Sequence, residues 1–241
     1  MLRGAIYGLT AASIWGGMYV VSDIVLQTIP PFTLLTMRLL LGIIVLAIFV
    51  WRLPNLSLPP RRNVMRFAAV GFVGFGVSVG AQFVGTDLSN AVNGALVTSA
   101  SPAFILLFAV VLLREHLTMQ RLFAVILATV GVVVIVDPTQ ADFGEETFVG
   151  NLVLAVAAVT WGLYSVLVRR VSTPTDADES TTDTLVVTFI GFFGGLLLTI
   201  PAAALELPQN PIGDINIGIV LGVLYLGMIS TAGAMWLWNR A

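Results

Sequence analysis

The sequence predicts an all-α protein that crosses a lipid bilayer several times, with its N-terminus in the cytoplasm. Hydrophobic residues make up 58% of the chain and charged residues only 10%, whereas a soluble domain carries about a quarter charged residues. The apolar residues form eight long runs, and the positive charges fall between alternate runs. This much apolar surface needs the bilayer as its solvent, and a helix satisfies its own backbone groups there.

Each apolar run is about long enough to cross the ~30 Å hydrocarbon core as a helix. The first run follows Arg3 and has no small-residue cleavage site with a soluble domain behind it, so we expect a retained helix rather than a signal peptide. The expected transmembrane helices are 4–26, 31–51, 67–86, 91–113, 120–137, 148–168, 184–205 and 215–238.

The positive charges predict the orientation of these helices. The chain has 11 Lys and Arg residues, all of them Arg; Arg38 lies inside the second run, and Arg121 stands at the cytoplasmic end of the fifth. Short loops rich in positive charge stay in the cytoplasm. We therefore expect the N-terminus and the loop 171–183 inside, and the Arg-free loop 138–147 outside. The arginines on the cytoplasmic side are Arg3, Arg52, Arg61, Arg62, Arg66, Arg114, Arg121, Arg169, Arg170 and Arg240.

The chain also contains an internal repeat with a constant offset of 146 residues, for example from Trp15 to Trp161. The first copy opens the first run and the second opens the sixth, so the repeat unit is five helices. An odd number of helices inverts the second copy in the membrane, as in many secondary transporters. We expect a five-helix repeat over 1–138 and an incomplete, inverted repeat of three helices over 147–241. The other matched pairs are Gly4 with Gly150, Ala11 with Ala157, Ala12 with Ala158 and Gly16 with Gly162.

Three features resemble one known group of transporters. Trp15-Gly16 lies near the middle of the first run, Arg38 lies in the second, and the stretch around Pro102 ends in Leu112-Leu113-Arg114-Glu115 before the Gly131-containing fifth run. These features resemble the EamA-like family of the drug/metabolite transporter superfamily. The resemblance implies a 5+5 fold of ten helices, a central cavity between the repeats and alternating-access carriage of small metabolites.

Aromatic residues inside the runs are candidates for a substrate cavity. Trp15 and Tyr19 lie four residues apart on one face of the first helix, and Trp161 and Tyr164 lie three apart on the sixth. The repeat places these pairs on opposite sides of its axis, where they line a common space at mid-membrane depth or pack between helices. Gln82 and Tyr225 are further polar candidates that face either the cavity or a neighbouring helix.

The fourth run carries a polar stretch that includes Asn93, Ser101 and Pro102. Pro102 removes one backbone hydrogen bond and frees the carbonyl of Thr98. In a membrane that carbonyl needs a neighbour, water or a ligand. The stretch is therefore either a gate or site wall, or a static kink satisfied by Ser and Thr hydroxyls.

Among the residues of the apolar runs, Arg38 costs the most free energy to place inside the bilayer. It lies seven residues after Pro31, about 10 Å below the external interface at ~1.5 Å per residue. A charge at that depth usually faces a cavity or a partner. In one interpretation its planar fork binds a carboxylate or phosphate of the substrate. In the other its role is structural, and it either snorkels outward or pairs with Asp23 near the outer end of the first helix.

No catalytic or cofactor motif is present. The sequence has no cysteine and one histidine, His116, and it lacks a Gly-rich phosphate loop. We therefore expect neither an enzyme nor a cofactor, and a solute rather than a nucleotide as partner. The net charge of −2 and the juxtamembrane position of the arginines argue against nucleic-acid binding.

The function predicted from these observations is a secondary, non-ATP carrier of small metabolites in a prokaryotic plasma membrane. Export of amino acids or related organic solutes is one candidate. The alternative is a non-transporting structural or regulatory membrane partner, or an inactive fragment that needs a second subunit. The pattern leaves monomer and homodimer open. Acidic, lysine-free loops suit a salt-rich habitat, and they equally suit plain hydrophilic connectors.

Overall fold

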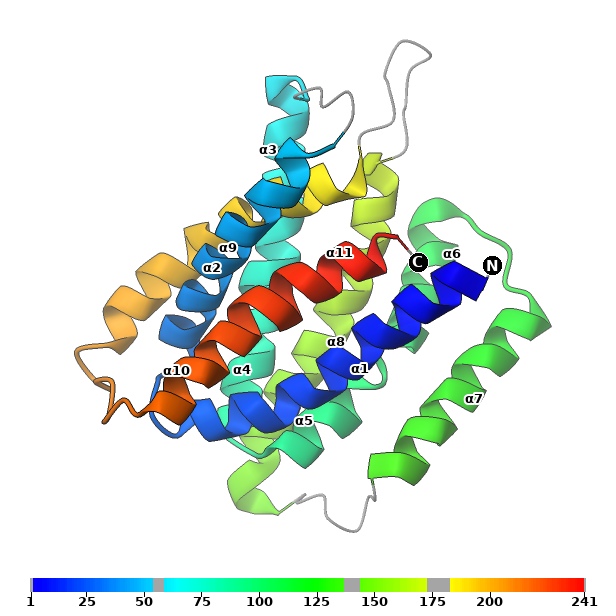
Figure 1. The fold of residues 1–241 in the computed structure, drawn as a ribbon. Helices are drawn as coiled ribbons and strands as arrows, with labels where there is room; N and C mark the ends of the chain where they lie inside the picture. The colour runs from blue at the N-terminus through cyan, green and yellow to red at the C-terminus, as the bar shows by residue number, and fades with distance from the viewer. Residues whose placement is uncertain (1, 54–58, 137–143, 173–182, 241) are drawn as a thin grey trace.

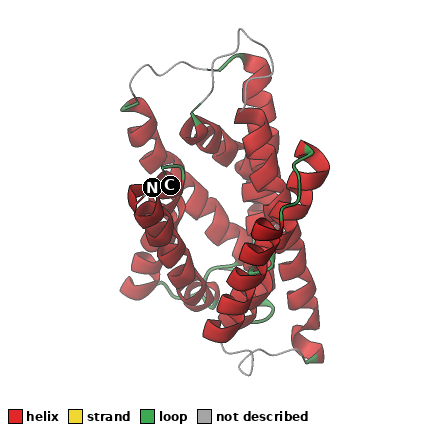
Figure 2. Cartoon of the chain, turned by 90° about the vertical axis from the view of Figure 1, so that its right-hand side faces the viewer, coloured by secondary structure: helices red, strands yellow, loops and turns green. Residues whose placement is uncertain are grey.

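The described residues fold entirely into helices and their connections (Figure 2). A computed structural model describes residues 2–53, 59–136, 144–172 and 183–240. Three of the apolar runs are divided into consecutive helical segments, two of them with a π-helical part. The elements are α1 (Leu2–Leu26), α2 (Pro31–Trp51), α3 (Arg61–Gly71), η1 (Phe72–Ser78), α4 (Val79–Asp87), α5 (Ala91–Thr98), α6 (Ser101–Leu113), α7 (Met119–Val136), α8 (Glu145–Ser172), α9 (Thr184–Glu206), α10 (Ile217–Leu224), η3 (Tyr225–Gly233) and α11 (Ala234–Trp238).

Seven helical spans among the described residues are long and apolar enough to cross a membrane. This number supports a polytopic membrane protein and falls one short of the eight predicted spans. The fifth run does form a helix, α7, but the side chains of 131–136 lie outside the described part, so its crossing stays a prediction. The seven spans are Gly4–Leu26, Pro31–Trp51, Arg61–Asp87, Ala91–Leu113, Thr147–Ser172, Thr184–Glu206 and Ile217–Trp238.

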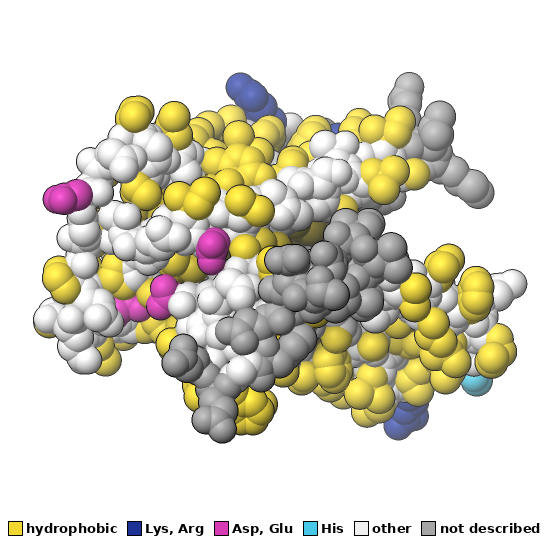
Figure 3. All heavy atoms as spheres, turned by 90° about the horizontal axis from the view of Figure 1, so that it is seen from below, with side chains coloured by type: hydrophobic (Ala, Val, Ile, Leu, Met, Phe, Trp, Pro, Cys, Tyr) yellow, Lys and Arg dark blue, Asp and Glu magenta, His cyan; other side chains and the backbone are white. Residues whose placement is uncertain are grey.

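The outer surface of the helices is strongly apolar. Leu9 on α1 and Leu197 on α9 are 70% and 68% exposed, and Phe123 on α7 is exposed as well. Figure 3 shows apolar side chains over much of the face seen from below, with few charges among them. Such a surface is stable against lipid and not against water.

Ion pairs join two loops that the sequence places in the cytoplasm. Glu115 pairs with Arg121 at 2.5 Å and with Arg169 at 2.6 Å, so it links the α6–α7 connection to the end of α8. The N-terminal part of α1 and the C-terminal part of α11 pack together at the same end of the bundle (Figure 1). These elements therefore lie on one side of the bundle, as the alternating direction of the predicted transmembrane helices requires. The loops 137–143 and 173–182 lie outside the described residues.

On the opposite side, Glu206 connects the end of α9 to the start of α2. Its carboxylate accepts hydrogen bonds from the backbone N–H groups of Phe32 and Thr33, at 3.2 and 2.9 Å, and from the Thr33 hydroxyl at 3.1 Å. Pro30 occupies the cap position of α2 and offers no side-chain acceptor. Glu206 thus supplies the acceptor that the helix start lacks, and its negative charge suits the helix dipole.

Glycines allow α3 and α9 to pack at very short range. A Cβ added to Gly71 would lie 2.1 Å from the backbone of Gly191, and one added to Gly194 would lie 1.9 Å from the carbonyl oxygen of Ala68. Only glycine fits at these positions, because a side chain would overlap the facing backbone. Small residues of this kind are the usual basis of close helix packing in membranes.

The fourth span breaks between α5 and α6, at the polar stretch that the sequence predicted to bend. Pro102 is the second residue of α6, and the freed carbonyl of Thr98 accepts a hydrogen bond from the Ser101 hydroxyl at 2.6 Å. The break is therefore satisfied within the chain by a hydroxyl, as the kink interpretation requires.

Two spans contain π-helical segments that the sequence did not predict. η1 lies within the third span and η3 within the last, which are the third helices of the two expected repeats. A π-helical turn shifts the hydrogen-bonding register from i−4 to i−5, and such turns are frequent at functional sites. In η3 the carbonyl of Leu226 accepts from the Thr231 hydroxyl at 2.7 Å.

The two expected repeats differ in what covers their first helices. Gly162 on α8 lies against α6, where an added Cβ would come 2.6 Å from Phe104. Its counterpart on α1, Gly16, has no atom within 4 Å of an added Cβ. Ala158 is likewise buried while its counterpart Ala12 is exposed. Within the described residues, α1 therefore lacks the helix that covers the matching face of α8.

This difference predicts opposite effects of one substitution at two matched positions. Gly162→Ala should lower the free energy of unfolding by about 1–3 kcal/mol, because the new methyl group overlaps α6. Gly16→Ala should be neutral or stabilise the protein by up to about 1 kcal/mol, because alanine is the better helix former. Thermal unfolding of the two detergent-solubilised variants checks this, and an equal loss in both would contradict the packing described.

Candidate functional site

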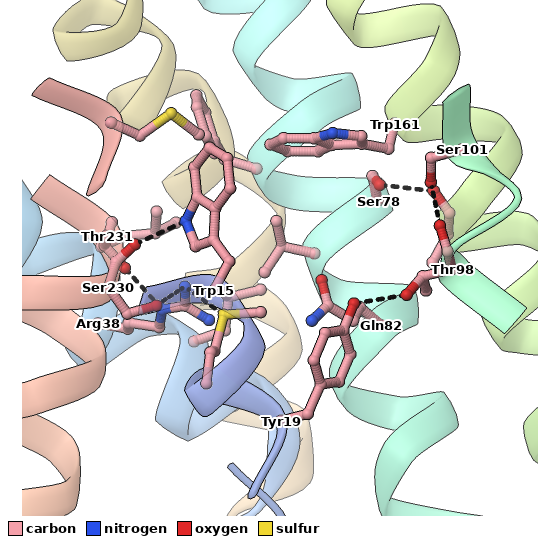
Figure 4. A pocket seen from close by; sticks show the side chains of 17 residues that line it. Trp15, Tyr19, Arg38, Ser78, Gln82, Thr98, Ser101, Trp161, Ser230 and Thr231 are labelled. Carbon is pink, nitrogen blue, oxygen red and sulfur yellow. Dashed lines mark hydrogen bonds between the residues drawn. The ribbon is translucent and has the colours of Figure 1, made fainter. Parts of the chain in front are cut away.

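A cavity of about 190 Å³ lies inside the bundle, between the elements of the two expected repeats. The segment 1–138 contributes α1, α2, η1, α4, α5 and α6 to its wall, and the segment 147–241 contributes α8, η3 and α11. The volume is below the roughly 300–1,000 Å³ of drug-sized sites, so it suits a smaller metabolite. Figure 4 shows the cavity with its lining side chains.

Six of the side chains expected at a substrate site line this one cavity. The prediction that the repeat-related tryptophans face a shared space is confirmed, since Trp15 reaches the cavity from α1 and Trp161 from α8. Of the remaining four, Arg38 comes from α2 and Gln82 from α4. The six residues are Trp15, Tyr19, Arg38, Gln82, Ser101 and Trp161.

Two other expected residues, Tyr164 and Tyr225, do not line the cavity. Tyr164 contacts Trp161, with the two ring centres 5.0 Å apart, but its own ring is not part of the cavity wall. Its ring packs against Gly74 and lies 5.0 Å from the ring of Phe75. Tyr225 donates its hydroxyl proton to the backbone carbonyl of Ile14 at 2.8 Å, which ties η3 to α1.

Asn93 and Pro102 also lie outside the cavity wall. The Asn93 side chain is fully buried and donates to the Asn151 side chain at 2.8 Å, so it joins α5 to α8. Pro102 follows Ser101 at the start of α6 and shapes the break rather than the wall. Both residues position cavity elements and do not face the space themselves.

The structure adds lining residues that the sequence did not single out as cavity residues. Polar ones are Ser78 in η1, Thr98 in α5, and Ser230 and Thr231 in η3. The only sequence signal for the last two is a Ser-Thr pair inside an apolar run, which by itself is compatible with lipid-facing or packed positions. Apolar additions are Met18, Leu35, Leu39, Phe75, Val79, Ala157 and Met235.

Arg38 is held by the π-helical segment η3. Its Nε donates to the Thr231 hydroxyl oxygen at 2.6 Å and to the carbonyl oxygen of Leu226 at 3.1 Å. The Nη2 group donates to the Met18 sulfur at 3.1 Å and to the Ser230 hydroxyl at 3.4 Å. Nη1 is buried and has no hydrogen-bond partner in the part of the chain that the structure describes. The side chain is only 5% exposed, and its guanidinium lies 5.1 Å from the ring centre of Phe83.

Neither of the two structural arrangements expected for Arg38 is formed. A snorkelling arginine would reach water, whereas this one is buried. The pairing with Asp23 is not formed either, because the partners of the guanidinium are uncharged and the ion pairs of the described residues all involve Glu115. The π-helical turn supplies carbonyl and hydroxyl oxygens at the right place, and the positive charge stays without a counter-charge.

The opposite wall of the cavity is a chain of satisfied hydroxyl groups (Figure 4). The Tyr19 and Thr98 hydroxyl oxygens lie 2.5 Å apart. Because Thr98 donates to the carbonyl of Gly94 at 2.6 Å, the proton of this contact comes from Tyr19. Ser78 donates to the carbonyl of Ala157 at 2.8 Å. The Gln82 amide lines the cavity without a hydrogen bond among the described residues.

The side chains that line the cavity are suited to binding a small molecule rather than to catalysing a reaction. The lining includes one cation and no carboxylate, and the described residues contain no group of three or more His, Cys, Asp or Glu side chains that could hold a metal ion. Four aromatic rings, from Trp15, Tyr19, Phe75 and Trp161, surround the space. An apolar cavity with a few fixed polar groups is typical of a small-molecule site.

Comparison with known proteins identifies the family. The sequence profile of the EamA-like transporter family matches residues 2–137 and 148–241, which is nearly the whole chain. The chain belongs to the EamA-like transporter family. The resemblance inferred from Trp15-Gly16, Arg38 and the Pro102 region is therefore confirmed, and this EamA-like protein is a membrane transporter by family.

Curated relatives carry the same description. An uncharacterized transporter of Archaeoglobus fulgidus is 25% identical over 95% of this chain and 76% of its own length. The uncharacterized transporters YyaM and YetK of Bacillus subtilis are each 25% identical, over 75% and 98% of this chain. The matches span 57% of YyaM and 70% of YetK. These relatives are bacterial and archaeal, and they are longer than this chain.

A solved crystal structure has the same fold. It superposes on the EamA-like chain with a TM-score of 0.71 at 23% sequence identity, and the match covers 98% of this chain and 79% of the other. At this identity the likeness speaks for the fold alone.

The contacts of Arg38 predict different effects for two buried threonines. Thr231→Val removes an acceptor from a buried cation and should lower the free energy of unfolding by about 1.5–3 kcal/mol. Thr199 is fully buried, and its hydroxyl has no hydrogen-bond partner within the described ranges, so Thr199→Val removes an unsatisfied group and should be neutral or stabilising. Unfolding of both purified variants measures this, and a loss confined to Thr199→Val would contradict the assignment.

Proposed function

We propose that the cavity is the substrate site of a secondary carrier that moves small metabolites by alternating access. The supporting observation is that one cavity is walled by elements from both segments matched by the family profile. In transporters built from inverted repeats the substrate lies between the repeats near the bilayer midplane. Rocking of one group of helices against another, with α3 and α9 moving together, then exposes the same side chains to each face in turn.

The two ends of the bundle carry contacts suited to such a cycle. The pairs of Glu115 with Arg121 and Arg169 hold one end, and the bonds of Glu206 to the start of α2 hold the other. The break before Ser101 and the π-helical segments η1 and η3 are points where backbone bonding is already irregular. The glycine contacts between α3 and α9 make that pair a rigid unit.

The driving force follows from what lines the cavity. A proton-coupled carrier needs a titratable carboxylate or histidine along its path, and the lining residues include none. Exchange of one solute for another, or facilitated movement down a gradient, fits this wall best. Amino acids and related organic solutes are the candidate cargo, and export across a prokaryotic plasma membrane is the candidate direction.

The alternative is a membrane partner that does not transport by itself. The exposed face of α1 around Gly16 supports this candidate, because the matching face of α8 is covered by α6. A second subunit or a second copy would then complete the bundle. Chemical labelling of a cysteine in the cavity from each side of the membrane distinguishes the two candidates.

Gln82→Cys tests the carrier without knowledge of its substrate. The chain has no cysteine, and Gln82 lines the cavity without a hydrogen bond to any described residue. In an alternating-access carrier this thiol should react with an impermeant methanethiosulfonate reagent added outside to intact cells, and also with reagent added to inside-out vesicles. Mass shift of the purified protein measures both reactions.

Ser22→Cys provides the matched control. Ser22 is 1% exposed and lies on α1 outside the cavity wall, so its thiol should stay unlabelled from either side. Labelling of the Gln82→Cys protein from one face only would contradict alternating access and favour the non-transporting alternative.

A further inference from the structure

We propose that the cavity selects organic monoanions, with a carboxylate on Arg38 and a flat apolar body against Trp15 and Trp161. This inference rests on the proposed carrier function and narrows its candidate cargo from amino acids and related organic solutes to organic monoanions. It begins from one observation: a buried arginine lines the cavity, and no acidic side chain lines it with Arg38.

The uncompensated charge points to an anion. Arginine stays protonated in proteins, and an isolated charge in an apolar interior is costly. The uncharged oxygens of Thr231, Leu226 and Ser230 solvate the guanidinium and leave its net charge unbalanced. A ligand carboxylate would provide the missing counter-charge, whereas an amine or a neutral solute would not.

The free edge of the guanidinium has the geometry for a carboxylate. The Nε edge is fixed by η3, so the orientation of the planar group is set before a ligand arrives. Nη1 is buried and has no hydrogen-bond partner among the described residues, and Nη2 donates to the thioether of Met18, which is a weak acceptor. A carboxylate that displaces the Met18 sulfur would accept from both Nη groups in the bidentate arrangement that arginine favours.

The remaining wall fits an apolar, planar body. The rings of Trp15 and Trp161 belong to α1 and α8, and Figure 4 shows Arg38 and Ser230 on one side of the cavity with Thr98 and Ser101 across it. The hydroxyls on that far side are already bonded within the chain. An ammonium group would therefore meet only neutral acceptors such as the Gln82 amide, which favours a monoanion over an amino-acid zwitterion.

Four solutes with one phenyl ring test this selectivity on the unmodified protein. Phenylacetate is the acid, phenylacetamide the neutral isostere, phenethylamine the cation and L-phenylalanine the zwitterion. We expect phenylacetate to bind purified protein at least about tenfold more tightly than each of the other three. Isothermal titration calorimetry measures binding, and uptake of the same labelled solutes into proteoliposomes follows transport.

Arg38→Lys tests the role of the fork, with Arg52→Lys as the control. Lysine keeps the charge and loses the planar pair of donors, so Arg38→Lys should weaken phenylacetate binding by about tenfold or more. Arg52 is exposed at the end of α2, and its replacement should leave binding unchanged. If Arg38→Lys does not fold, the selectivity of the unmodified protein still decides the proposal.

Three results would overturn the inference. They are equal affinity for phenylacetate and phenylacetamide, tighter binding of the amine or the zwitterion, and complete displacement of phenylacetate by an equal concentration of chloride, which would indicate an inorganic-anion site. Each of these leaves the carrier intact if the cavity cysteine is labelled from both faces. Labelling from one face refutes the carrier whatever the selectivity, so the two failures are distinguishable.

Discussion

Arg38 places a guanidinium inside a helical bundle, and the arrangement of the site follows from how that charge is accommodated. The last span departs from α-helical bonding in η3, so that the Leu226 carbonyl and the Thr231 hydroxyl face α2 and accept from Nε. The same segment offers the Ser230 carbonyl to the Trp15 indole at 3.0 Å. One irregular segment thus orients both a cation and an aromatic ring toward the cavity, and a regular α-helix would use those carbonyls internally.

The EamA-like fold also brings the two matched segments into contact around this cavity. Gly71, Gly191 and Gly194 allow α3 and α9 to touch through their backbones, which makes one rigid pair from helices that belong to different segments. The tryptophans related by the 146-residue offset, Trp15 and Trp161, then face the same space. The unequal cover of Gly16 and Gly162 shows where the described bundle departs from internal symmetry.

The helical fold and part of the site could be predicted from the sequence because they depend on local pattern. Long apolar runs must be helices in lipid, and the repeated Trp-Gly placed two rings in one cavity. Tyr164 and Tyr225 escaped prediction, because packing against Gly74 and Phe75 places the first ring and a bond to the Ile14 carbonyl places the second. The π-helical segments depend on which neighbour competes for a backbone carbonyl, and the sequence of one span does not contain that neighbour.

A structure determined with 4-bromophenylacetate would locate an anion in the cavity, since the bromine marks the ligand by anomalous scattering. We expect a bromine peak between Trp15 and Trp161, with the ligand carboxylate within hydrogen-bonding distance of Arg38 Nη1 and the Met18 sulfur displaced from Nη2. A ligand bound with its carboxylate away from Arg38, or a cavity that stays empty at saturating ligand, would contradict this expectation.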